Sequence, residues 1–229
     1  MRFLATAALG ALAAPASADF IILDAERAVT VDLAARDARG GLHDPDPVAF
    51  AASGVGAFDR TASASAHSPY ASAFVAGTAE LESFVGAARI AAGARVILDA
   101  STVFDGDAYD AVVRASVSIR FRVTRDTLVH YFLSWDPSYE QIDFIRLADG
   151  APLFDGASLA GEVGPHEALL AAGDYLITAE TGLYAFGDTL IVSDARSTFG
   201  AFDLRAVAAP LPAMLPLPAV ACLAARRRR

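Results

Sequence analysis

The sequence predicts an all-β body, an antiparallel β-sandwich of jelly-roll type, between an N-terminal signal helix and a short C-terminal apolar segment. Three observations predict this fold class. Short runs of strand-forming residues recur along the chain, turns rich in Gly, Asp and Pro separate them, and helical periodicity is almost absent. Short strands at regular spacing are typical of two-sheet sandwiches.

The first half of the body gives less distinct signals than the second. Two early strands are predicted at residues 20–23 and 28–33, and residues 36–47, with two Gly and two Pro, are predicted to form a loop. Residues 71–90 are ambiguous. Their alanine content permits a helix, while residues 72–75 and 83–85 fit strands equally well.

The clearest strand covers residues 117–124, where apolar and polar residues alternate strictly. Because successive side chains of a strand point to opposite faces, this pattern places Arg120 and Arg122 on the outer face. Further strands are predicted at residues 127–135, 141–147, 172–179, 187–192 and 198–207.

Charge is distributed unevenly along the 229 residues. The formal net charge is -9, from 18 basic residues, all of them Arg, and 27 acidic ones. Every acidic residue and 13 of the arginines lie between Asp19 and Arg205, so the body is strongly acidic. An acidic surface repels phosphate backbones, and the sequence therefore argues against a nucleic-acid partner. The single cysteine, Cys222, excludes an internal disulfide.

Residues 1–18 have the three parts of a secretory signal peptide. Arg2 supplies a positive charge, residues 3–14 form an apolar run, and Ala16 and Ala18 fit the small-residue rule for signal cleavage. A buried N-terminal helix is the alternative. The signal peptide implies the Sec machinery and signal peptidase as partners, and a body that begins at residue 19.

Residues 207–229 form a second segment suited to a membrane. Residues 207–225 carry no charge, although their four prolines resist helix formation. The closing arginines, Arg226, Arg227, Arg228 and Arg229, supply the positive charge that is retained on the cytoplasmic side. The body is therefore predicted to span residues 19–206.

This tail resembles the VPLPA-type subgroup of PEP-CTERM sorting signals. The resemblance lies in a Pro-Leu-Pro-Ala motif, an apolar segment and a terminal arginine cluster. The motif occurs at residues 209–213 and again at 215–219, and the first copy, with Pro210, Leu211, Pro212 and Ala213, leaves the longer apolar segment. The resemblance implies transient inner-membrane association, cleavage by an exosortase and a link to exopolysaccharide or biofilm. A plain membrane anchor and a disordered end are the alternatives.

An acidic loop is the best candidate for a metal site. Asp105, Asp107 and Asp110 could present oxygen ligands to calcium, although the spacing does not fit an EF-hand. The alternative is a solvated turn between strands. No other cofactor is predicted.

Aromatic residues near Trp135 could form a platform for a sugar ring. The group comprises Tyr131, Phe132, Trp135 and Tyr139. Alternation places Tyr131, Leu133 and Trp135 on one face with Val129, which favours the core for that set.

No residue is predicted to be catalytic. The four histidines are scattered, and Ser158, between Gly156 and Gly161, lacks the spacing of a nucleophile elbow. The sequence thus predicts an exported, exosortase-processed protein of the cell surface or extracellular matrix without catalytic activity. The main alternative is a secreted calcium- or carbohydrate-binding module, and a secreted hydrolase is a third.

Overall fold

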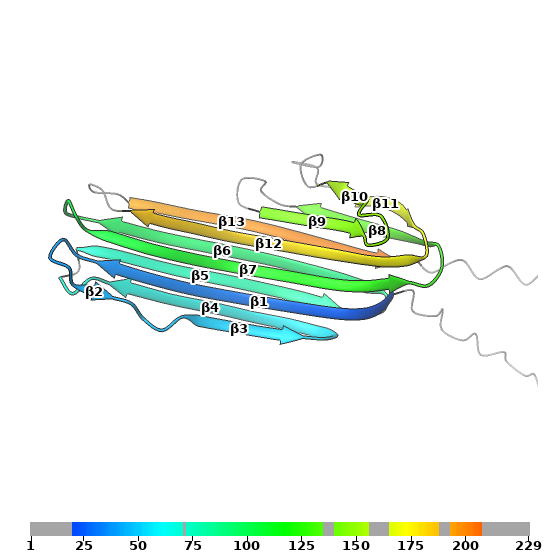
Figure 1. Cartoon of the computed structure of the whole chain (residues 1–229), viewed down its shortest axis with the longest axis horizontal. Coiled ribbons are helices and arrows are strands. Elements are labelled where there is room, and N and C mark those ends of the chain that lie inside the picture. Colours follow the sequence, from blue (N-terminus) through cyan, green and yellow to red (C-terminus); the bar gives the residue numbers. More distant parts are fainter. Residues whose placement is uncertain (1–19, 71, 135–139, 156–164, 188–192, 208–229) are drawn as a thin grey trace, which may run out of the picture.

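The computed structural model describes residues 20–70, 72–134, 140–155, 165–187 and 193–207. Across these ranges the chain forms 13 β-strands and no helix, so none of the described segments is a helix able to cross a membrane. The strands form two antiparallel sheets that share one hydrophobic core (Figure 1). The predicted all-β sandwich is thereby confirmed, and the predicted signal helix and apolar C-terminal segment lie outside the described residues.

Sheet A contains seven strands. They are β1 (Phe20–Arg36), β2 (Leu42–His43), β3 (Val48–Ser53), β7 (Ala108–Val123), β9 (Glu140–Arg146), β10 (Pro152–Asp155) and β12 (Gly173–Gly187). Their order is β10-β9-β12-β7-β1-β2, and β3 also pairs with β1.

Sheet B contains the other six strands. They are β4 (Gly56–His67), β5 (Ala73–Val85), β6 (Arg89–Thr102), β8 (Thr127–Ser134), β11 (Pro165–Leu170) and β13 (Ser193–Ala206). Their order is β11-β8-β13-β6-β5-β4, which places β4 at one edge of the sheet.

The two early strands predicted at residues 20–23 and 28–33 are one continuous strand, β1. The residues between them continue the pairing with β7, and a bulge between Ile22 and Asp24 shifts the register. This extra residue keeps both Phe20 and Ala25 on the buried face. The loop predicted at residues 36–47 contains the short strand β2.

The ambiguous residues 71–90 contain a strand. Every second side chain of β5, from Ala73 to Val85, is buried, which is the period of a strand and not of a helix. The alternation of residues 117–124 is likewise confirmed in β7, where Arg120 and Arg122 face outward and both pair with Asp174 of β12.

The core changes character along the sandwich. One part is aromatic, because the ring of Phe121 lies 5.1 Å from that of Phe20 and 5.6 Å from that of Tyr175. Elsewhere small residues bring the sheets close together. A Cβ atom on Gly77 of β5 would lie 2.5 Å from Cγ2 of Val113 in β7, so a methyl group does not fit there.

Both ends of the described body lie beside one turn. The Phe20 amide donates to the Ala87 carbonyl at 2.9 Å, and the Ala206 amide donates to the neighbouring Ala88 carbonyl at 3.0 Å. Ala87 and Ala88 belong to the turn between β5 and β6. The chain therefore enters and leaves the sandwich at the same end (Figure 1).

Candidate functional site

Most of the residues predicted for export and sorting lie outside the described residues. These are Ala16, Ala18, Pro210, Leu211, Pro212, Ala213 and Arg226 to Arg229, and the same holds for Trp135, Tyr139 and Ser158. The sites that the structure does describe are on the body itself.

The three calcium candidates do not face one point. Asp107 is fully buried, Asp105 is exposed in the turn before it, and Asp110 is exposed on β7. Within the described ranges no group of three or more His, Cys, Asp or Glu side chains could hold a metal ion.

Asp107 instead joins three loops at the end of the body far from Phe20. Its Oδ1 accepts hydrogen bonds from the Ala38 amide and the Ser72 hydroxyl, both at 3.0 Å. Its Oδ2 accepts from the amides of Phe104 at 2.9 Å and Val103 at 3.3 Å. Burial acts to raise the pKa of Asp107, but these four donors outweigh burial and lower it.

The predicted facing of the aromatic strand is confirmed for the described residues of β8. Val129 and Leu133 are buried, and Tyr131, on the same face, packs against the core and stacks on His166. Phe132 points to the opposite, outer face of sheet B. It lines a groove there that sequence reasoning did not identify.

The groove on the outer face of sheet B has a volume of about 780 Å³. Strand pairing places Phe84, Ala91, Asp203 and Phe132 in one row across β5, β6, β13 and β8. The two phenylalanines are three strand spacings apart, roughly 14 Å. The floor between them is made of small residues, since Gly93 and Ala201 pair in the next row.

A carboxylate is fixed in the middle of this row. Asp203 accepts hydrogen bonds from Arg89 at 3.1 and 3.0 Å and from Arg205 at distances down to 2.7 Å. Burial acts to raise the pKa of Asp203, but the two guanidinium groups outweigh it and hold the pKa below its usual value. The groove therefore contains an oriented ion-pair network between two aromatic side chains.

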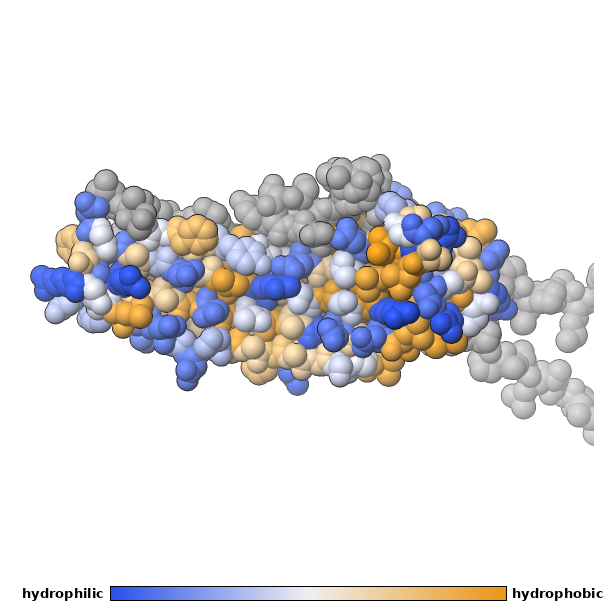
Figure 2. Space-filling view, viewed as in Figure 1, coloured by the Kyte–Doolittle hydropathy of each residue, from blue (hydrophilic) through white to orange (hydrophobic). Residues whose placement is uncertain are grey.

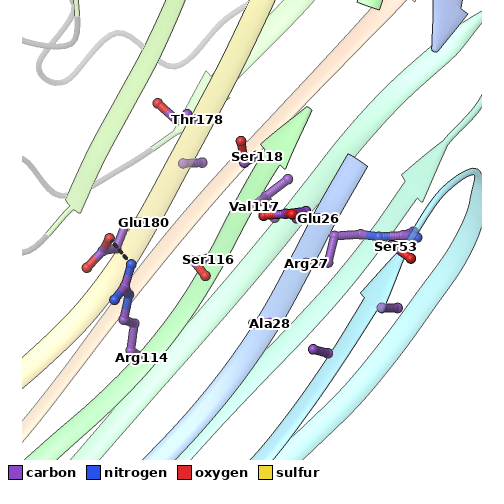
Figure 3. A pocket seen from close by; sticks show the side chains of 13 residues that line it. Glu26, Arg27, Ala28, Ser53, Arg114, Ser116, Val117, Ser118, Thr178 and Glu180 are labelled. Atoms are coloured by element: carbon purple, nitrogen blue, oxygen red, sulfur yellow. Dashed lines mark hydrogen bonds and ion pairs between the residues drawn. The ribbon is translucent and has the colours of Figure 1, made fainter. Parts of the chain in front are cut away.

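The outer face of sheet A carries a second groove, of about 650 Å³, over β3, β1, β7 and β12 (Figure 3). The side chains with hydroxyl groups that line it are Ser53, Ser116, Ser118 and Thr178. Arg114 pairs with Glu180 at 2.6 Å across its rim, and Tyr184 donates to the other Glu180 oxygen at 2.9 Å. Burial and this hydrogen bond raise the pKa of Tyr184.

Figure 2 shows that polar and apolar residues are mixed over the outer face of sheet A, with apolar residues gathered where β1 begins. Ile21 and Leu23, which are 47% and 41% exposed, lie in that part of β1. This apolar surface adjoins the end at which the chain enters and leaves the sandwich.

Comparison of the chain with protein-family models, curated proteins and solved structures found no match in any of the three.

Proposed function

We propose that the protein is exported with one end of its body toward the membrane, and that an exosortase processes its tail at Pro210 to Ala213. One observation carries this proposal. The chain enters at Phe20 and leaves after Ala206 on either side of a single turn, so both predicted membrane-directed segments adjoin one end of the body. A body attached in this way exposes its long faces and its far end.

We propose in addition that the sandwich is a jelly roll. Strands β6 to β13 support this, because they form two four-stranded sets in the orders β6-β13-β8-β11 and β7-β12-β9-β10. In each set the first strand in the sequence lies beside the last, because β6 pairs with β13 and β7 pairs with β12. This is the arrangement of two interlocked Greek keys. The earlier strands extend the sheets, β1 beside β7 and β5 beside β6.

The proposed role at the surface or in the matrix is non-catalytic. It is supported by the contacts of one carboxylate in each groove. Glu180 is engaged by Arg114 and Tyr184, and Asp203 by Arg89 and Arg205. The two guanidinium groups hold the pKa of Asp203 below its usual value, and a carboxylate stabilised in its charged form is a poor proton acceptor.

Mass spectrometry of the mature protein from surface and medium fractions of a host that has an exosortase tests this proposal. We expect a C-terminus at or near the 209–213 motif and loss of Arg226 to Arg229. Changing Pro210 and Pro212 to Ala should leave the tail attached, whereas the matched change of Pro216 and Pro218 should not. An intact arginine cluster on the surface protein contradicts the proposal.

A second candidate function is carbohydrate binding by the groove on sheet B. It is favoured by the row of Phe84, Asp203 and Phe132, since aromatic faces pack against the CH groups of sugar rings while the ion-pair network offers polar contacts. A separation of three strand spacings, roughly 14 Å, between the backbone positions of the two phenylalanines fits an extended chain of sugars better than a single one.

Calorimetry with the exopolysaccharide of the host tests the second candidate. We expect F84A and F132A each to weaken binding about tenfold or more, in line with the loss of an aromatic contact. Phe186 is the matched control, because it is 82% exposed and belongs to sheet A. Equal binding by F84A, F132A and F186A removes this candidate. A calcium titration that gives no heat removes the calcium alternative.

A further inference from the structure

We propose that two copies of this chain associate through the free edge of β4, pairing antiparallel about Ser63. In the described structure β4 is the last strand of sheet B, with β5 as its neighbour on one side. An unpaired edge presents backbone N–H and C=O groups that can pair with another strand. Pairing with a second strand can occur only where these backbone groups of β4 have no other hydrogen-bond partner.

The register of β4 and β5 shows which groups are open. The Ser68 amide donates to the Ala73 carbonyl, which makes residues 68 and 73 a hydrogen-bonded pair. Hydrogen-bonded and non-hydrogen-bonded pairs alternate in an antiparallel ladder, and pairing continues without a shift to Gly56. The amides and carbonyls of the odd-numbered residues of β4 therefore point away from β5, toward the free edge.

Side chains cap this edge near both of its ends. The His67 amide, at the end nearer the loops, donates to Nδ1 of His43 at 3.1 Å. Near the other end, Arg60 donates from its guanidinium to the Asp59 carbonyl at 2.7 Å. Between these two caps the open groups are those of Thr61, Ser63 and Ser65.

The part of β4 between the two caps, Thr61 to Ser65, is called the open stretch, and it is complementary to itself. Its side chains carry no charge, and those of Thr61, Ser63 and Ser65 are exposed. A two-fold axis at Ser63, the midpoint, pairs Ser63 with Ser63 of the second copy and Thr61 with its Ser65. This register satisfies all the open groups through about six backbone hydrogen bonds and leaves both caps in place.

The charges beyond the open stretch agree with this register. Asp59 comes to lie opposite His67 of the second copy, so no two like charges face each other. A shift of the axis toward either end would bring a capped group into the ladder. It would also leave an open group unpaired, which carries a free-energy cost once the edge is covered.

The pairing is antiparallel, so the ends that bear Phe20 and Ala206 lie at opposite ends of the pair. Two copies tethered upright on one surface cannot form it, whereas released copies can. This consequence alone rests on the proposed processing of the tail. The pairing itself does not, and it is tested on purified protein.

Cysteine cross-linking of the full chain, purified in mild detergent with Cys222 changed to Ser, tests the register. Residues opposite each other in a hydrogen-bonded pair have Cα atoms about 5.5 Å apart, within the range for a disulfide. We expect S63C to give a disulfide-linked dimer on a non-reducing gel. S65C alone should still associate but run as an uncross-linked single chain on the same gel, and mixing S65C with T61C should give a disulfide-linked mixed dimer.

The mass of the uncross-linked protein in solution gives a second test. S63K places two ammonium groups at the axis and should convert dimer to monomer, while S63A should stay dimeric. Both changes lie at an exposed side chain, and thermal unfolding verifies that each variant folds. The proposal is overturned if S63C gives no disulfide-linked dimer, if S65C cross-links as well as S63C, or if S63K remains a dimer in solution.

Discussion

The hydroxyl of Ser72 donates to the carboxylate of Asp107 at 3.0 Å, and this contact joins the loop before β5 to the loop before β7. The Ala38 amide, from the loop after β1, bonds the same oxygen. A single buried carboxylate thus joins connections of both sheets at the end of the body that faces away from Phe20. Asp107 is therefore a structural residue that holds the loops together at this end of the body.

We expect D107N to lower the free energy of unfolding by about 3 kcal/mol, because its amide group would face donors that now bond a carboxylate oxygen. Urea unfolding measures the change. D105N is the matched control, since Asp105 is exposed in the same turn, and it should change stability by less than about 0.5 kcal/mol. Equal stabilities of the two variants would argue against a structural role for Asp107.

The stability should also depend on pH through Asp107. Its pKa is lower in the folded protein than in the unfolded chain, so its contribution is present above the unfolded value and is lost as pH falls through the folded value. We expect the free energy of unfolding to decrease as the pH is lowered below about 4. The decrease should be smaller in D107N. Urea unfolding at several pH values makes the comparison, and parallel curves contradict it.

The sequence identified Asp107 as notable but could not give its surroundings. Its partners Ala38 and Ser72 lie far away along the chain, and no local pattern encodes their approach. The same limit applies to Phe84 and Phe132, which are brought into one row only by the pairing of β5, β6, β13 and β8. Alternation, by contrast, is local, and it correctly predicted the outward arginines of β7 and the buried face of β8.

Arg27 is a second case in which a long-range contact explains a local anomaly. It occupies an inward position of β1 and is 3% exposed. Its guanidinium donates to the carbonyls of Gly54 at 2.7 Å and Gly56 at 2.9 Å, in the turn through which the chain passes from sheet A to sheet B. Burial lowers the pKa of Arg27. Alternation places Arg27 in the core, but only the fold shows why a cation is tolerated there.

We expect R27M to lower the free energy of unfolding by about 2 to 4 kcal/mol, because two carbonyls lose a charged donor. R27K, with one ammonium in place of the forked guanidinium, should fall between R27M and the parent. Thermal and urea unfolding measure both. R114M is the control, since Arg114 is 45% exposed in its side chain and should cost less than about 1 kcal/mol. An R27M variant with the same free energy of unfolding as the parent would show that the turn is held by other contacts.

Two glycines on opposite faces of sheet B should respond differently to the same substitution. Gly77 faces the core, where a Cβ atom would meet Val113 at 2.5 Å and Val31 at 3.2 Å, so G77A must separate the sheets. We expect G77A to destabilise the protein by about 1 to 3 kcal/mol. Gly93 lies on the floor of the outer groove, where an added Cβ would meet only Ala201, at 3.9 Å. G93A should therefore leave stability unchanged or raise it by up to about 1 kcal/mol, since alanine restricts the unfolded chain.

The two variants together also separate stability from binding in the groove. If the groove binds an extended ligand, G93A raises its floor and should weaken binding without unfolding the protein. G77A should reduce stability and leave the affinity of the folded fraction unchanged. Urea unfolding and calorimetry on the same preparations give both quantities. Equal loss of stability in G77A and G93A would contradict the predicted difference between the core face and the outer face of sheet B.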